Sequence, residues 1–289
     1  MQPADGAPNR TLPPDALPLG FLGAGNMGGA LVRGIVASGA APAADILVHE
    51  PRAHIAGSLA AECGAVLAAD NREVAARCRT LVLAVKPQHA AAVLDGIAPG
   101  VGAGHLLVSI CAGLPTAFLE ARAPGVRVVR AMPNTPALIG LGATGLCAGR
   151  HATARDLTTA WALFEPLGIV EVLGEDQMDT VTALSGSGPA YVFRLIEALV
   201  DAAQAEGMPR DVAERLAKRT LLGAATLAER STRPPAELRE AVTSPNGTTA
   251  AGLAALEGEG FARAVAACVA AARARGASLA AEAGRPPSA

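Results

Sequence analysis

The sequence has few aromatic residues, few charged residues and almost no lysine. Of its 289 residues, 2% are Phe, Trp or Tyr and 17% are charged, and the formal net charge is −2. A chain without an excess of positive charge has no long-range field to attract phosphate backbones or anionic lipid headgroups. We therefore expect neither a nucleic acid nor a membrane as a partner.

The sequence also lacks paired cysteines, a signal peptide and an uninterrupted apolar segment. Its five cysteines are odd in number and widely separated, which is typical of reduced, buried thiols and predicts no metal site. Residues 1–16 contain four prolines and no apolar core. Two uncharged stretches, 96–119 and 131–149, are broken by Gly and Pro and do not resemble membrane helices. These features predict a cytoplasmic protein.

What the sequence does contain is 51% hydrophobic residues, enough for a large core. Up to Glu175, short apolar runs alternate with alanine-rich segments of helical length. This alternation predicts an α/β fold, a Rossmann-like doubly wound parallel sheet over residues 17–176. The predicted strands are Leu17–Leu22, Ile46–Glu50, Thr80–Val85, Leu106–Cys111 and Val126–Met132, with Ala143–Ala148 and Ile169–Leu173 flanking a predicted helix over Ala154–Phe164.

The strand pattern stops after Asp176, and helical spacing replaces it. We predict an all-helical C-terminal domain over residues 177–283, with disordered tails at residues 1–16 and 284–289. The predicted helices are Ala190–Ala205, Pro209–Arg230, Pro235–Thr243, Thr248–Glu257 and Phe261–Ala283.

A glycine-rich turn follows the first predicted strand. Gly23, Gly25 and Gly28 have the GxGxxG spacing. In such a turn the first glycine permits the bend, the second lets a pyrophosphate approach the backbone, and the third lets helix and strand pack closely. The helix N-terminus adds N–H groups and a partial positive charge. A turn without a ligand is the alternative, but the strand before it and the helix after it favour dinucleotide binding.

The second predicted strand ends where the adenosine ribose of a dinucleotide is expected. Glu50 there favours NADH, because a carboxylate accepts from a ribose hydroxyl and repels a 2′-phosphate. Arg52 favours NADPH, because a guanidinium can bind that phosphate. Both residues can also be solvated strand-end residues, and the sequence leaves the choice of cofactor open.

Two further turns follow strands whose carboxyl ends face the same edge of the sheet. Lys86, in the run Ala84–Pro87, is predicted to point towards the ligand crevice, and it is one of only two lysines in the chain. The small residues of Cys111–Gly113 leave space for a nicotinamide. Cys111 is not expected to be a nucleophile, since no histidine or basic residue adjoins it.

Four separated motifs give the chain a resemblance to a known family. These are AVKP at 84–87, AMPNTP at 131–136, LSGSGPAY at 184–191 and TSPNGTT at 243–249. Together with the glycine-rich turn, the chain resembles the pyrroline-5-carboxylate reductases from Leu19 to about Ala272. The resemblance implies hydride transfer from NADPH or NADH to a cyclic imine in proline biosynthesis, a small-molecule substrate, and self-association as a dimer or higher homo-oligomer.

The resemblance also implies roles for individual residues. The pyrophosphate is expected at Leu22, Gly23, Ala24, Gly25, Asn26 and Met27, with Gly28 supporting the turn; the adenosine end at Glu50 and Asn71, with Arg52 nearby; and the nicotinamide at Ala84, Lys86, Pro87 and Ala112. The substrate is expected at Glu175, Thr248 and Thr249. We expect catalytic roles for Thr249 and Lys86, no metal, and a helical domain that serves dimerisation.

The SPNGTT segment supports the substrate role on local grounds. Pro245, Asn246 and Gly247 form a predicted turn, and Thr248 and Thr249 open a predicted helix whose N–H groups suit a substrate carboxylate. The Thr249 hydroxyl can bond to the ring nitrogen. An ordinary threonine helix cap is the alternative.

Proteins with other functions share some of these residues. Hydroxyacid dehydrogenases share the glycine-rich turn but use a lysine in the helical domain, where Lys218 lies in a charged run typical of a solvated helix face. An imine reductase of broader scope stays open. A regulator that binds the cofactor without catalysis is less favoured, since the AVKP and SPNGTT segments are intact.

Overall fold

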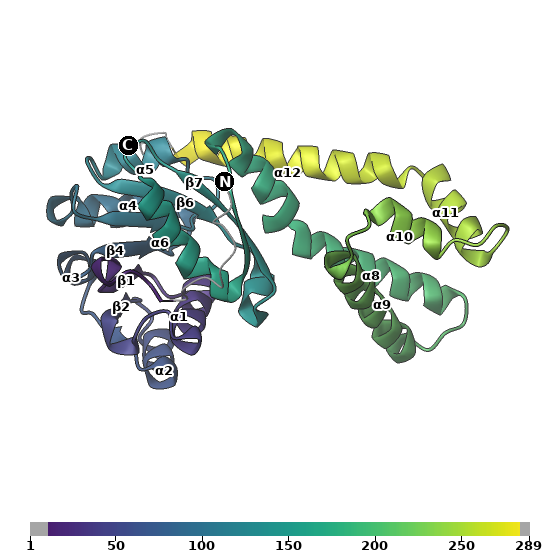
Figure 1. Cartoon of the computed structure of the whole chain (residues 1–289), viewed down its shortest axis with the longest axis horizontal. Helices are drawn as coiled ribbons and strands as arrows, with labels where there is room; N and C mark the ends of the chain where they lie inside the picture. Colours follow the sequence, from purple (N-terminus) through teal and green to yellow (C-terminus); the bar gives the residue numbers. More distant parts are fainter. Residues whose placement is uncertain (1–10, 284–289) are drawn as a thin grey trace. The chain divides into compact units, whose positions relative to one another are not determined.

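The computed structural model describes residues 11–283, and it contains two compact units (Figure 1). Within the described residues, the first unit covers residues 11–187 and 272–283, and the second is Gly188–Ala271. The first unit contains the sheet and the second is helical. The expected fold class, a Rossmann-like domain followed by an all-helical segment, is confirmed.

An eight-stranded sheet forms the centre of the first unit, in the order β3-β2-β1-β4-β5-β6-β7-β8. Neighbouring strands are parallel except for β6 and β7. The strands are β1 Leu19–Leu22, β2 Ile46–His49, β3 Val66–Leu67, β4 Thr80–Leu83, β5 Leu106–Ser109, β6 Arg127–Met132, β7 Gly142–Ala148 and β8 Gly168–Val172. All seven predicted strands are present with ends that differ by one or two residues, whereas β3 was missed because two residues carry no alternation.

Helices cover both faces of this sheet. They are α1 Asn26–Ser38, α2 Ala53–Cys63, α3 Asn71–Arg77, α4 Pro87–Ile97, α5 Thr116–Arg122 and α6 Ala154–Phe164. Successive strand residues point to opposite faces, so Phe21 belongs to the core with Phe164 while Leu22 belongs to the core with Leu94. Burial on both faces explains why the strands are continuous apolar runs.

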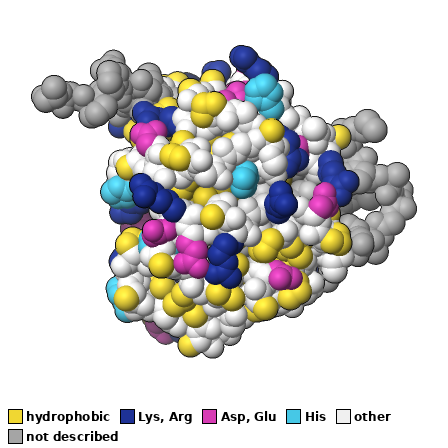
Figure 2. All heavy atoms as spheres, turned by 90° about the vertical axis from the view of Figure 1, so that its left-hand side faces the viewer, with side chains coloured by type: hydrophobic (Ala, Val, Ile, Leu, Met, Phe, Trp, Pro, Cys, Tyr) yellow, Lys and Arg dark blue, Asp and Glu magenta, His cyan; other side chains and the backbone are white. Residues whose placement is uncertain are grey.

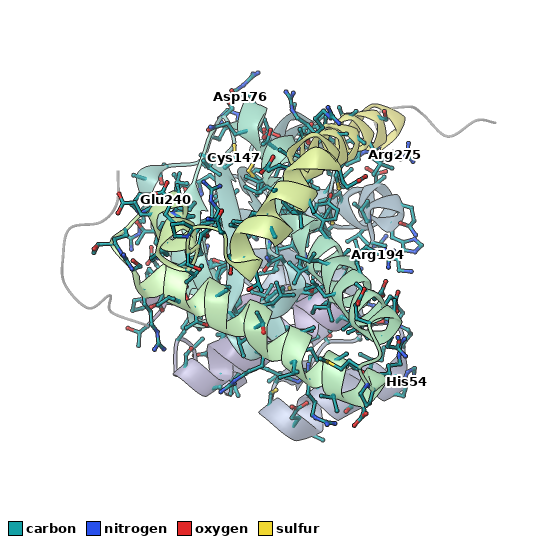
Figure 3. All side chains as sticks on the ribbon, turned by 90° about the vertical axis from the view of Figure 1, so that its right-hand side faces the viewer. His54, Cys147, Asp176, Arg194, Glu240 and Arg275 are labelled. Carbon is teal, nitrogen blue, oxygen red and sulfur yellow. The ribbon has the colours of Figure 1, made fainter. Side chains whose placement is uncertain are left out.

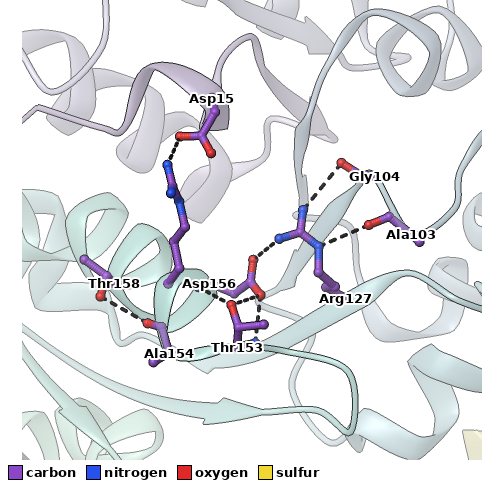
Figure 4. A network of polar contacts seen from close by, with 9 residues as sticks. Asp15, Ala103, Gly104, Arg127, Thr153, Ala154, Asp156 and Thr158 are labelled. Carbon is purple, nitrogen blue, oxygen red and sulfur yellow. Dashed lines mark hydrogen bonds and ion pairs between the residues drawn. The ribbon is translucent and has the colours of Figure 1, made fainter.

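The segment before β1 is part of the first unit. Leu12 is buried in the core and donates its N–H to the Ala40 carbonyl at 2.8 Å. Asp15, in the short 3-10 helix Pro14–Ala16, pairs with Arg155 (Figure 4). The tail predicted over residues 1–16 is therefore wrong for residues 11–16, because one leucine among prolines carries no periodicity. Residues 1–10 and 284–289 lie outside the described residues.

A capped helix fixes the amino end of β6. Asp156 of α6 accepts hydrogen bonds from Thr153 and forms an ion pair with Arg127 (Figure 4). Arg127 also donates to the carbonyls of Ala103 and Gly104 at 3.3 and 3.4 Å. This network joins β6 to α6 and to the loop before β5.

The chain stays in the first unit past the predicted domain boundary. Met178 of α7, Met178–Val181, and Ala183 of a π-helical turn, Thr182–Gly186, are both fully buried. A Cβ at Gly145 of β7 would lie 2.8 Å from Val181, so this segment packs on the sheet. By contacts, the first unit continues to Ser187, and the domain boundary expected at Asp176 stays a prediction.

The second unit is built from α8 Gly188–Ala205, α9 Arg210–Arg230, α10 Pro235–Ala241, α11 Thr248–Gly258 and the first part of α12 Phe261–Ala283. Only Val200 and Ala213 are buried among its described hydrophobic residues. Large apolar side chains are exposed, including Val192, Phe193, Leu199, Leu216, Leu222, Leu227, Leu256 and Phe261. Over residues 11–283, no helix combines the length and the apolar character needed to cross a membrane.

Candidate functional site

The glycine-rich turn joins β1 to α1, and two of its glycines are sterically required. Gly23 has φ +95°, and a Cβ there would lie 2.9 Å from the Ala84 carbonyl oxygen. A Cβ at Gly28 would lie 2.8 Å from the Gly23 oxygen. Gly25 differs, since its φ is −61° and its Cβ direction is open apart from the Arg52 guanidinium at 3.6 Å. Gly25 is therefore the point at which a ligand can reach the backbone.

Glu50 is buried beneath this turn, with 4% of its side chain exposed. It accepts hydrogen bonds from the Ala24 N–H at 3.0 Å and from the Arg52 Nε and Nη2 at 2.6 and 3.0 Å. The bond from Arg52 contributes most, and the one from Ala24 adds to it, in lowering the pKa of Glu50 to about 2 despite its burial. The end of β2 therefore presents an ionised carboxylate beside an exposed guanidinium.

Cys111 connects the two turns expected to hold the nicotinamide. Its Sγ lies 3.2 Å from the carbonyl oxygen of Val85, next to Lys86. Burial raises the pKa of Cys111 to about 11, so the thiol stays protonated and donates. Lys86 is exposed, directly precedes α4, and takes part in none of the ion pairs found within residues 11–283.

A cavity of about 420 Å³ opens near the end of β2. It is lined by His49, Asp70, Asn71, Arg72, His89, Ala92, Val93 and Gly96. Asn71 Oδ1 is buried there without a hydrogen-bond partner within the described part of the chain. A buried amide oxygen is costly to leave unpaired, so this atom can accept a bond from a ligand that enters the cavity.

Glu175 follows β8, and its carboxylate is already engaged. It pairs with the buried Arg130 of β6 and accepts from the Thr116 N–H at 3.2 Å. Cys147 Sγ lies 3.6 Å from the same carboxylate, and Asp176 is close to this cysteine (Figure 3). The substrate contact expected of Glu175 stays a prediction.

The AMPNTP motif contacts the first part of the LSGSGPAY motif, residues 184–187, within the first unit. Asn134 donates from Nδ2 to the Ser185 carbonyl at 3.1 Å and accepts the Ala143 N–H at 2.9 Å. A Cβ at Gly186 would collide with the end of the Met132 side chain. The space at Gly186 is thus taken up by Met132 of the same chain.

The SPNGTT segment lies in the second unit and forms the expected turn. Asn246 has φ +59°, and the Gly247 N–H donates to the Ser244 carbonyl at 3.0 Å. Gly247, which has no hydroxyl, is the N-cap of α11. Thr248 and Thr249 are exposed in the first turn of the helix, so the ordinary threonine cap is not what the structure contains.

Leu22 precedes the glycine-rich turn and supports it. It is fully buried in the central strand, where its carbonyl accepts from the Ala84 N–H, and the pyrophosphate contact expected of it stays a prediction. Arg130 and Asn134 were missed, because nothing in an apolar strand or a Pro-Asn turn shows which distant partner they have.

No group of three or more His, Cys, Asp or Glu side chains with metal-binding geometry occurs within residues 11–283. The face of the molecule in Figure 2 shows acidic and basic side chains interspersed with apolar ones. This face therefore carries no large patch of one sign.

Two family models match the chain. One, described as pyrroline-5-carboxylate reductase dimerisation, covers residues 175–279, and one described as NADP oxidoreductase, coenzyme F420-dependent, covers residues 18–113. The matched ranges fall on the helical segment and on the strands and helices around the glycine-rich turn, respectively.

Curated proteins and solved structures resemble the chain over nearly its whole length. The pyrroline-5-carboxylate reductase of Pseudomonas aeruginosa is 44% identical over 92% of this chain and 98% of that protein. A Plasmodium falciparum pyrroline carboxylate reductase with NADP bound superposes with a TM-score of 0.82 at 33% identity, covering 92% and 99% of the two chains. The Coxiella burnetii pyrroline-5-carboxylate reductase gives 0.86 at 34% identity, covering 91% and 98%.

Proposed function

The chain belongs to the pyrroline-5-carboxylate reductase family, and from this premise we propose how its residues divide the work of the reaction. It is an NAD(P)H-dependent oxidoreductase of proline biosynthesis that reduces the C=N bond of 1-pyrroline-5-carboxylate to give L-proline. Three turns, at Gly23–Gly28, Ala84–Pro87 and Cys111–Gly113, lie together at one edge of the sheet. The roles proposed for individual residues rest on this arrangement.

The glycine-rich turn holds the cofactor diphosphate. The open Cβ direction of Gly25 leaves room for it, and the first N–H groups of α1, at Asn26 and Met27, face it. Ala24 takes part through the shape of the turn, because its N–H is bonded to Glu50. Asn71, with its unpaired buried oxygen, accepts from the adenosine end. These features fit a nicotinamide dinucleotide.

The nicotinamide end lies against Ala84, Pro87 and Ala112. Cys111 joins the turn at Cys111–Gly113 to the turn at Ala84–Pro87 through its hydrogen bond to the Val85 carbonyl. Lys86 is exposed between them and supplies a positive charge to the cofactor ribose or to the substrate carboxylate. The cofactor, when bound, supplies a hydride; the chain supplies its position.

The substrate is held by the start of α11. The N–H groups there bind the carboxylate, and the exposed hydroxyl of Thr249 bonds to the ring nitrogen, with Thr248 beside it. A protonated cyclic imine accepts a hydride at carbon without a strong acid, since the electron pair of the C=N bond passes to nitrogen. Positioning therefore provides most of the catalysis.

Both NADH and NADPH are used, with a ratio set by Glu50 and Arg52. The carboxylate is ionised and buried, which favours the 2′-hydroxyl of NADH. The guanidinium is 55% exposed beside it and attracts the 2′-phosphate of NADPH. The relative from Plasmodium falciparum has NADP bound.

The chain forms a homo-oligomer, which we infer to be at least a dimer. The exposed apolar side chains of the second unit supply the contact surface, and the helical segment over residues 177–283 carries dimerisation and substrate binding. Free cysteines, all five unpaired with one another, support a location in the reducing cytoplasm.

The test is the loss of reduced-nicotinamide absorbance on addition of pyrroline-5-carboxylate to the wild-type protein and to Thr249→Ala, Thr249→Ser and Lys86→Met. We expect Thr249→Ala to raise the substrate KM and lower kcat, Thr249→Ser to recover part of both, and Lys86→Met to raise KM. Unchanged kinetics in Thr249→Ala would remove that residue from the mechanism. Absence of turnover by the wild type would reject the proposal.

A further inference from the structure

A buried arginine lies at the carboxyl edge of the sheet, and the roles proposed above do not use it. Arg130 is on β6, level with Ser109 of β5 and Cys147 of β7, and only 4% of its side chain is exposed. A buried charge is retained at low cost only where it is paired and hydrogen-bonded. Its partners therefore indicate what it does.

Arg130 pairs with two carboxylates that come much later in the chain. Its Nη1 donates to Glu175 Oε1, and its Nη2 lies 3.4 Å from Asp179 Oδ1. Both carboxylates are about one-third exposed. Without the guanidinium, either carboxylate would turn towards solvent, because a hydrated carboxylate has a lower free energy than an unpaired one packed against protein.

The second oxygen of Glu175 reaches the segment that follows the nicotinamide turn. Glu175 Oε2 accepts from the backbone N–H of Thr116, the first residue of α5, at 3.2 Å. The thiol of Cys147 lies 3.6 Å from the same oxygen, and its pKa is raised to about 12 by burial and by this carboxylate, so it is a donor. Arg130 and Thr116 thus hold the two oxygens of one carboxylate.

We propose that Arg130 is a positioning residue for the nicotinamide turn. It fixes Glu175, and Glu175 holds the Thr116 N–H and, through it, the backbone of Cys111–Gly113. The proposal rests on the function proposed for that turn. It assigns Glu175 to the support of the cofactor site, whereas the sequence predicts that Glu175 contacts the substrate.

The chain offers a matched control on the same strand. Arg127 also pairs with a buried carboxylate, that of Asp156, but it lies at the amino end of β6 and bonds to the loop before β5. Arg127→Met should therefore lower the free energy of unfolding as Arg130→Met does, but it should leave the turn at Cys111–Gly113 unchanged. Arg130→Lys keeps the positive charge but loses the two separate Nη donors that reach Glu175 and Asp179.

The experiment measures two quantities on the full-length oligomer of each variant. Hydrogen–deuterium exchange reports the opening of a peptide that spans Thr116, and calorimetric titration with NADH and with NADPH gives the cofactor Kd. We expect Arg130→Met and Glu175→Gln each to speed exchange at Thr116 and to raise Kd about tenfold. For Arg130→Lys, the exchange rate at Thr116 and the cofactor Kd should lie between those of these two variants and those of the wild type. The double variant Arg130→Met/Glu175→Gln should have a Kd no higher than that of either single variant.

Three results would overturn the proposal. These are equal changes in Kd for Arg130→Met and Arg127→Met, faster exchange without a change in Kd, or a change in the pyrroline-5-carboxylate KM alone. If Arg130→Met does not fold, Arg130→Lys and Glu175→Gln give the same comparison. A wild-type protein that binds neither cofactor would reject the proposed function, and exchange at Thr116 would still show whether Arg130 holds the turn.

Discussion

The carboxylate of Glu50 accepts a hydrogen bond from the backbone N–H of Ala24, with 3.0 Å between the nitrogen and Oε2. Glu50 follows β2 and Ala24 lies in the glycine-rich turn, so one side chain joins two segments that the sequence presents as separate signals. The same carboxylate binds Arg52. The shape of the turn and the charge at the end of β2 are therefore coupled through one residue.

The choice between NADH and NADPH should change with either member of the Glu50–Arg52 pair. Glu50→Gln keeps an acceptor for the Ala24 N–H and removes the negative charge, so the ratio of kcat/KM for NADPH over NADH should rise roughly tenfold. Arg52→Gln should lower that ratio, because it removes the charge available to a 2′-phosphate. Steady-state kinetics with both cofactors measures this. A ratio that moves in the same direction in both variants would contradict it.

Glu50 should also make stability depend on acid. Its folded-state pKa, about 2, lies below the ordinary value of 4.5, so its contribution is complete above pH 4.5 and is lost as pH falls towards 2. Allowing for screening at the half-exposed Arg52, the loss by pH 3 is about 1–2 kcal/mol. Urea unfolding at fixed protein concentration, at pH 7 and pH 3, should show a loss of unfolding free energy that is larger by this amount in the wild type than in Glu50→Gln, because the other ionised carboxylates are common to both.

Two glycines of one turn should respond differently to the same substitution. Gly25→Ala should leave the melting temperature near that of the wild type and raise the cofactor Kd more than tenfold, since the new Cβ occupies the space left for the diphosphate. Gly23→Ala should lower stability by about 2–3 kcal/mol, because of its positive φ and the nearby Ala84 carbonyl. Cofactor binding by Gly25→Ala with wild-type affinity would place the diphosphate elsewhere.

The buried cysteines should not react in the native protein. Burial raises the pKa of Cys111 to about 11 and that of Cys78 and Cys147 to about 12, so the reactive thiolate is scarce at pH 8. Mass spectrometry after treatment with iodoacetamide at pH 8 should find these three unmodified, and turnover should persist. The same treatment in guanidinium is the control. Modification of native Cys111 with loss of turnover would give that residue a more direct role.

Much of the fold follows from local pattern. The strands and the helices of the second unit are present close to their predicted bounds, and α6 and α12 have the predicted ends. Periodicity and turn residues are properties of neighbouring positions, so they can be read along the chain. The disordered tail predicted over residues 1–16 is wrong for residues 11–16 because a distant residue decides their structure. The N–H of Leu12 donates to the carbonyl of Ala40, and no local pattern shows this contact.

By itself, the sequence determined seven of the eight strands, the helices of the second unit, the glycine-rich turn and the four motifs that identify the family. Only the tertiary structure decided that Glu50 accepts a hydrogen bond from the glycine-rich turn, that Leu22 is fully buried at the end of β1, and that Arg130 pairs with Glu175. Local signals arise from residues a few positions apart. A buried ion pair between strand and helix depends on how the chain packs, and no spacing in the sequence encodes it.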